Sequence, residues 1–253
     1  MKIYSAYSFI ISALLILTQF LSTPPGADRN IYIFAVALVH AIFGIWFLKG
    51  KDSVAFARAS AVSRFGIGCM FVTAGVFQVG AAGLAVFPLP VYFLLHGVVD
   101  ILAGSATFWL TRKLPQTTRE ATPLTLEFYN RFLFALYMMA LSFWVLLHSA
   151  SFVGFFHLPV LSGQRSPYFP PNALQVFAVL LLQLSFFNLV AVRHRIAPLI
   201  AAGMRGGLFA CVFVLILVAL RVVHPLVLLL PAIDLLSIAA IGVSRLRHSR
   251  AQG

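Results

Sequence analysis

Long apolar stretches recur along the whole chain and are separated by short polar or proline-containing turns. A transmembrane helix needs about 20 mostly apolar residues to cross the hydrocarbon core of a bilayer, and most of the stretches have about this length. The pattern therefore predicts an all-α polytopic membrane protein with eight transmembrane helices. We expect the spans at residues 5–21, 31–48, 54–80, 91–111, 132–153, 173–192, 198–223 and 225–243.

Three apolar segments of the first half recur, in the same order, in the second half. The most informative pair holds the only two acids that fall inside expected spans, Asp100 in the sequence VDIL and Asp234 in the sequence IDLL. We therefore predict two four-helix repeats, residues 1–114 and 131–253, joined by a polar cytoplasmic linker, residues 115–130. The other matched segments are 34–36 with 177–179 and 64–72 with 205–214.

The basic residues predict the orientation of the spans. Of the 18 Lys and Arg residues, only Arg29, Arg165 and Arg221 fall on the side of the membrane opposite to the N-terminus. Cytoplasmic loops of membrane proteins carry an excess of Lys and Arg, so we expect both termini in the cytoplasm. An even number of spans in each repeat gives both repeats the same orientation, which makes them parallel rather than inverted repeats.

Composition agrees with a membrane location. Hydrophobic residues make up 61% and charged residues 9% of the 253 residues, against about 45–50% and about 25% in soluble domains. The net charge of +12 does not indicate nucleic acid, because no basic run is interleaved with the aromatic residues on which single strands stack. Cys69 and Cys211 are too few and too far apart for a redox motif or a zinc cluster, so we expect no metal site.

The two aspartates are the first candidates for a functional site. An ionised Asp at bilayer depth is costly, so it faces the interior of the helix bundle and finds a partner there. His96 precedes Asp100 by one helical turn on the same face, a spacing at which side chains meet. Leu230 takes the corresponding place before Asp234.

Arg64 and Arg205, in the adjacent spans, are the partners that we expect for Asp100 and Asp234. At about 1.5 Å per residue they lie roughly 10 Å nearer the cytoplasm than the aspartates, so a contact needs an outward-reaching arginine or a bridging water. These residues either hold each four-helix unit together, through polar contacts worth about 1 kcal/mol each, or form a proton or ion pathway, or bind a ligand. The sequence leaves all three open.

Histidines introduce haem as an alternative. His40, His96 and His148 fall inside expected spans, and haem needs one or two axial histidines at matching depth. His40 corresponds to Gln183 in the second half, so the repeats do not share a ligand set. We expect no cofactor, with His40 and His96 as the alternative site for haem b or a quinone. We also expect no catalytic residue, because nothing resembles a nucleophile elbow, a phosphate loop or a HExxH helix.

Several of these segments resemble the DoxX-like superfamily of four-span bacterial membrane proteins. The resemblance rests on FAVL at 177–180, NLVAVR at 188–193, Arg205 and IDLL at 233–236, and in the first half on Arg64 and VDI at 99–101. It implies a fused tandem of two such units in the bacterial cytoplasmic membrane. Some members of this superfamily are subunits of redox enzymes, such as those of quinone-linked sulfur oxidation, and others resemble assembly factors. The resemblance implies no particular catalytic residues.

Three functions follow from these observations. The leading hypothesis is a non-catalytic scaffold or accessory subunit, with other membrane protein subunits as partners, because the loops are short and no catalytic group of residues is recognisable. The second is a redox component associated with quinone or haem b, acting through His96, Asp100 and His40. The third is a small proton-coupled transporter with Asp100 and Asp234 at the membrane midplane.

Overall fold

The computed structural model describes residues 1–21, 31–82, 89–115, 126–158, 173–236, 238–239 and 243. Within this part of the chain the secondary structure is helical and includes no strand, as the apolar pattern predicts. The 3-10 turn η1 continues into an α-helix, and together they form an apolar segment, Pro225–Leu236, that we call the C-terminal helix. The elements are α1 (Lys2–Leu21), α2 (Ile31–Lys49), α3 (Val54–Ala82), α4 (Leu89–Thr111), α5 (Leu126–Leu147), α6 (Ser149–Phe155), α7 (Ala173–Arg193), α8 (Ala197–Ala219) and η1 (Pro225–Leu228).

Six of the described helices are long and apolar enough to cross a membrane, and the protein is therefore a multi-pass membrane protein. The expected first and eighth spans coincide with two shorter apolar helices, Lys2–Leu17 and the C-terminal helix, so the number of eight spans stays a prediction. The six span-length segments are Ile31–Lys49, Val54–Val76, Phe93–Thr111, Leu126–Leu147, Leu174–Arg193 and Ala197–Ala219.

The fifth span differs from its predicted limits, 132–153, at both ends. α5 begins at Leu126, so it includes the last residues of the predicted linker, and Arg131, which the prediction left just before the span, lies inside the helix. The helix then ends at Leu147, because His148 has φ −140° and ψ 52°, far from the helical values of about −63° and −42°. The short helix α6 follows this break, and the earlier start of α5 places an unexpected cation in the bundle.

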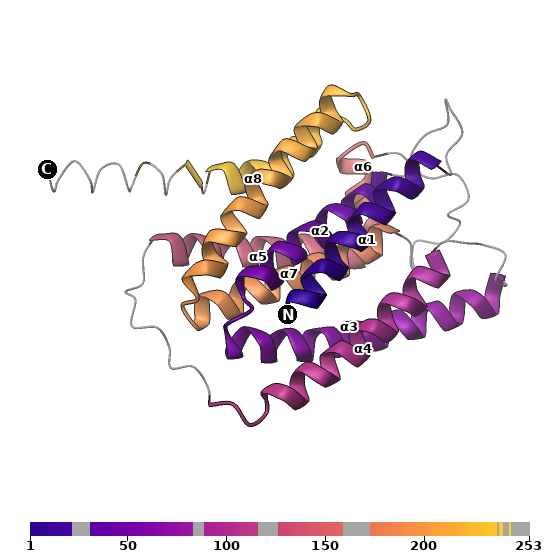
Figure 1. Cartoon of the computed structure of the whole chain (residues 1–253). Coiled ribbons are helices and arrows are strands. Elements are labelled where there is room, and N and C mark those ends of the chain that lie inside the picture. Colours follow the sequence, from indigo (N-terminus) through magenta and orange to yellow (C-terminus); the bar gives the residue numbers. More distant parts are fainter. Residues whose placement is uncertain are drawn as a thin grey trace, which may run out of the picture.

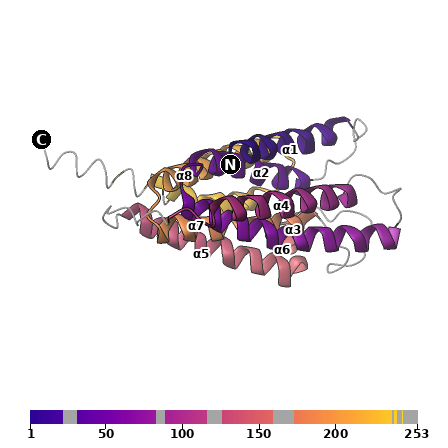
Figure 2. The ribbon, with the colours of Figure 1, turned by 60° about the horizontal axis from the view of Figure 1, so that its bottom comes forward.

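α2 and α7 lie at the centre of the bundle and are the most buried of the span-length helices. α1 packs on α2, α5 packs on α7, and α8 contacts both central helices. Figure 1 shows the path of the chain, and Figure 2 shows the long helices lying roughly side by side, with α1 and α5 at opposite edges of that view. A row of helices α1, α2, α7 and α5 therefore links the two halves of the chain.

α3 and α4 form the most extensive helix pair, and two glycines allow their backbones to touch. A Cβ atom on Gly97 would lie 2.8 Å from the carbonyl oxygen of Gly68, and a Cβ on Gly68 would lie 2.7 Å from that of Gly97. Small residues at a crossing bring helices close together in a membrane, where van der Waals contact replaces the hydrophobic effect as the driving force. This pair positions Arg64 on α3 and Asp100 on α4.

Candidate functional site

A buried polar cluster in the first half surrounds Asp100. His96, one turn earlier on α4, places its Nε2 atom 3.4 Å from Asp100 Oδ2, and the two side chains are 3% and 1% exposed. The hydroxyl of Tyr7 lies 2.8 Å from His96 Nδ1, and the hydroxyl of Tyr4 donates a hydrogen bond to Asp100 Oδ1. The structure thus brings His96 and Asp100 together as their spacing predicts, and adds two tyrosines from the N-terminal helix.

Arg64 reaches this cluster through Tyr4. Its Cζ atom lies 4.2 Å from the centre of the Tyr4 ring, a cation–π geometry. Its Nε donates to the Ser60 carbonyl oxygen at 3.2 Å, and Nη2 donates to Thr107 Oγ1 at 2.8 Å. The sequence suggested a long arginine reach or a bridging water between Arg64 and Asp100; in the structure the ring and hydroxyl of Tyr4 make the connection.

His40 contacts His96 directly, and this geometry does not fit a haem b held between the two rings. The two rings meet edge to face with centroids 4.8 Å apart. Axial histidines lie on either side of a porphyrin plane and each gives one ring nitrogen to the iron. Here the rings are too close to enclose a porphyrin, and both nitrogens of His96 already lie beside Tyr7 and Asp100.

The second polar group lies in the second half and corrects the expected partner of Asp234. Nη1 of Arg131, on α5, lies 3.3 Å from Asp234 Oδ1, and the two side chains are 0% and 3% exposed. Arg205 is exposed instead. α8 meets Asp234 at Gly207, where an added Cβ would collide with Oδ2 of Asp234. Arg205 precedes Gly207 by two residues, which is about 200° around a helix of 3.6 residues per turn, so it points away.

In each half, the first helix contacts the aspartate and the residue one turn before it. In the first half, Tyr4 of α1 contacts Asp100, and Tyr7 contacts His96 one turn earlier. In the second half Arg131 of α5 contacts Asp234. The hydroxyl of Tyr137, also on α5, donates to the carbonyl oxygen of Leu230, one turn before Asp234, at 3.3 Å. The first helix of each half therefore supplies polar partners at the aspartate and at the position one turn before it.

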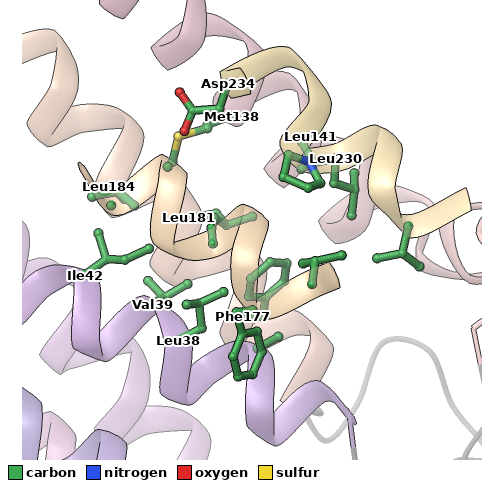
Figure 3. A pocket seen from close by; sticks show the side chains of 18 of the residues that line it. Leu38, Val39, Ile42, Met138, Leu141, Phe177, Leu181, Leu184, Leu230 and Asp234 are labelled. Carbon is green, nitrogen blue, oxygen red and sulfur yellow. The ribbon is translucent and has the colours of Figure 1, made fainter. Parts of the chain in front are cut away.

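A partly open cavity of about 180 Å³ adjoins the second group. It lies among α2, α5, α7, α8 and the C-terminal helix, and its walls are mostly Leu, Ile, Val and Phe side chains. Figure 3 draws Asp234 at one end of this group of side chains and Phe177 with Leu38 at the other. Asp234 lines the cavity, whereas Asp100 is not among the lining residues.

The two charged lining residues, Arg131 and Asp234, gather at one end of the cavity with Trp46 and Asn188, whereas Tyr137 lines its middle and Tyr32 its other end. Neighbouring spans run in opposite directions, so a common end appears as the last lining residue of one helix and the first of the next. On α2, α7 and the C-terminal helix, the last residue that lines the cavity is a polar one. On α5 the first lining residue is polar, and on α8 it is the glycine that faces these polar side chains. These residues are Trp46 on α2, Arg131 on α5, Asn188 on α7, Gly203 on α8 and Asp234 on the C-terminal helix.

Three of these side chains have buried polar atoms without a hydrogen-bond or ion-pair partner among the described residues. Buried polar atoms in native structures are nearly always paired, so each exception needs an explanation. Trp46 and Asn188 were not candidates from the sequence, although Asn188 opens the NLVAVR segment and is a polar residue within an apolar span. The atoms are Trp46 Nε1, Arg131 Nε and Nη2, and Asn188 Oδ1.

The described residues contain no group of three or more His, Cys, Asp or Glu side chains that could hold a metal ion. Comparisons of the chain with protein-family models, with curated proteins and with solved structures give no match. The geometry of the two polar groups and of the cavity therefore carries the functional argument.

Proposed function

We propose that this protein binds an amphiphilic molecule within the membrane, in the cavity of its second half. One observation carries the proposal: the cavity is apolar along its length and has unsatisfied polar groups gathered at one end. Small-molecule sites have this character, with apolar walls and a few polar groups that orient the ligand. An amphiphile has the matching distribution, an apolar tail and one polar head.

We further propose the eight-span, two-repeat architecture, with both termini in the cytoplasm of a bacterium. The resemblance to the DoxX-like superfamily and the distribution of Lys and Arg support it. The contacts between the halves support it too: α2 touches α7 and α8, and α7 touches α2 and α3. α7 and α8 are the counterparts of α2 and α3 in the second half. Replacing each helix by its counterpart turns the contact of α2 with α8 into that of α7 with α3 and leaves the contact of α2 with α7 as it is, so the contacts between the halves are symmetric. α1 has 20 residues, which at 1.5 Å each span the roughly 30 Å of a hydrocarbon core.

Amphiphile binding is compatible with the leading hypothesis of an accessory subunit that performs no chemistry of its own. It also keeps the quinone alternative, in the reduced form that carries hydroxyl groups on the ring, but places it beside Arg131 and Asp234 instead of His96 and His40. A symmetric transporter is less favoured by the geometry. Such a transporter needs both aspartates at an accessible site, and Asp100 lies under Tyr4 and His96 and is 1% exposed.

Photolabelling tests the proposed site. The protein is placed in phosphatidylcholine nanodiscs with a single-chain alcohol that carries a diazirine in its tail, and the labelled residues are identified by mass spectrometry. We expect labels to concentrate on cavity residues such as Phe177 and Leu181 and to be displaced by excess unlabelled alcohol. Labels spread evenly over the lipid-facing surface, with no displacement, would show that the cavity binds nothing.

A pair of matched variants on α8 sharpens the test. Ala210 lines the cavity, and Ala210→Leu adds three carbons to its wall. Ala201 is exposed on the same helix, and Ala201→Leu adds the same volume outside the cavity. We expect Ala210→Leu to abolish the displaceable labelling and Ala201→Leu to leave it unchanged; equal effects of the two variants would contradict the assignment.

A further inference from the structure

The polar end of the cavity has both unused donors and unused acceptors. Nε and Nη2 of Arg131 and Nε1 of Trp46 are donors, and each lacks a hydrogen-bond partner among the described residues. Oδ1 of Asn188 is an acceptor in the same condition. Nη1 of Arg131 and Oδ1 of Asp234 face each other in the ion pair, 3.3 Å apart. A head group that both donates and accepts hydrogen bonds would satisfy this end of the cavity.

These groups pack closely around a glycine that itself lines the cavity. A Cβ atom on Gly203 would lie 3.1 Å from Trp46 Cζ2, 3.3 Å from Asn188 Oδ1 and 3.5 Å from Arg131 Cζ. Side chains from α2, α7 and α5 therefore meet beside one point of the α8 backbone that carries no side chain of its own. The three polar side chains thus border the same end of the cavity.

The charge of the site restricts the head group further. Arg131 and Asp234 form an ion pair, so the polar end is neutral as a whole. All four polar side chains are at most 3% exposed. A carboxylate, phosphate or ammonium head would add an uncompensated charge at a buried position, which is costly. A neutral head adds no such penalty.

We propose that the ligand is a neutral amphiphile with a hydroxyl head, a long-chain alcohol or phenol. This inference rests on the amphiphile-binding function proposed above and names the ligand class of the same site. A hydroxyl both donates and accepts, so it donates to Asn188 Oδ1 and accepts from Arg131 or Trp46. Ethers, esters and carbonyl heads accept only, and leave Asn188 Oδ1 unsatisfied.

The dimensions of the cavity agree with a single tail. Its volume of about 180 Å³ exceeds the roughly 150 Å³ of an engineered protein cavity that holds benzene. On α2 the lining runs from Ile31 to Trp46, about 22 Å along a helix. With the head beside Trp46 and Asn188, the tail extends along α2 towards Ile31.

Two isomeric probes separate head-group recognition from binding of the tail. 1-Octanol and 1-methoxyheptane have the same atoms, but only the alcohol donates a hydrogen bond. Each competes with the diazirine alcohol at equal mole fraction in the nanodisc, together with octanoate and octyltrimethylammonium. We expect 1-octanol to compete about tenfold better than its isomer, the effect of one lost hydrogen bond to a buried acceptor, and better than either charged probe.

Two alanine substitutions on α8 assign the preference to the polar end. Gly203→Ala places a methyl among Trp46, Asn188 and Arg131, whereas the Cβ of Gly206→Ala would lie 3.2 Å from Ile42 Cγ2 on the apolar wall. We expect Gly203→Ala to remove the preference for the alcohol and Gly206→Ala to keep it.

The outcomes separate the two proposals. Equal competition by 1-octanol and 1-methoxyheptane would leave the amphiphile site in place and overturn the hydroxyl head group. Tighter binding of octanoate would overturn it in favour of an anion. Absence of any displaceable labelling in the unsubstituted protein would overturn amphiphile binding itself. A preference that survives Gly203→Ala but disappears in Gly206→Ala would place the head elsewhere in the cavity and overturn its assignment to Arg131 and Asn188.

Discussion

The ion pair between Arg131 and Asp234 should be the most strongly coupled polar contact of the second half. Its atoms lie 3.3 Å apart, and both side chains are shielded from water. Two unit charges at this distance attract by about 5 kcal/mol at an effective dielectric constant of about 20. Desolvation of both ions offsets much of that attraction, but removal of one partner leaves the other charge buried and unpaired, at a typical cost of about 3–5 kcal/mol.

A double-mutant cycle measures this coupling. The variants are Arg131→Met, Asp234→Asn and the two combined, and the measured quantity is the free energy of unfolding in bicelles from denaturant titration. We expect each single variant to lose about 3–5 kcal/mol, and the combined variant to lose about as much as one of them, because it no longer buries an unpaired charge.

The same cycle distinguishes Arg131 from the partner that the sequence suggested. Arg205→Met removes an exposed cation on α8, and we expect it to change the stability by no more than about 0.5 kcal/mol and to show no coupling to Asp234→Asn. Losses of Arg131→Met and Asp234→Asn that add within about 0.5 kcal/mol would refute the ion pair. Coupling between Arg205 and Asp234 would refute the orientation of α8.

Two further contacts give predictions of stability that the same unfolding measurement checks. Tyr4→Phe removes the hydrogen bond to Asp100 and should lower the free energy of unfolding by about 1–3 kcal/mol. The control Tyr129→Phe changes a side chain that is 57% exposed and should cost nothing measurable. Similar losses for both variants would show that the hydroxyl of Tyr4 contributes nothing specific. Gly97→Ala forces α3 and α4 apart at their backbone contact and should cost about 1–3 kcal/mol, whereas Gly66→Ala has no atom within 4 Å of its added carbon and should be neutral. A stable Gly97→Ala variant would disprove the close crossing.

Local spacing in the sequence predicted what lies within one helix, and it did so for His96 and Asp100. The positions are four residues apart on α4, and this spacing alone places them on one face. The apolar pattern similarly predicted an all-helical membrane protein, because length and hydropathy decide whether a segment can cross a bilayer. These features need no knowledge of how the helices are rotated against one another.

The partner of Asp234 depends on that rotation, and there the sequence was misleading. The match between the two halves favoured Arg205 because Arg64 occupies the corresponding place, but α8 turns Gly207 towards Asp234. α2 and α8 are apolar around their whole circumference, as is usual for helices surrounded by lipid or protein. Such helices carry no polar stripe from which their orientation could be read. The convergence of Trp46, Asn188 and Arg131 was therefore hidden until the helices were packed.

The two halves use their aspartates differently, and the surrounding residues explain how. Asp100 is covered by Tyr4 of α1 and by His96 of its own helix, and it links α4 to α1. At Asp234 the corresponding histidine is Leu230, and Gly207 faces the carboxylate without a side chain, so the same position borders a cavity. In the two-repeat architecture that we propose, fusion into one chain allows each half to change alone, which a symmetric dimer of identical four-helix units could not do. One half then stabilises the bundle while the other binds the ligand, and the proposal accordingly places one amphiphile site in each chain.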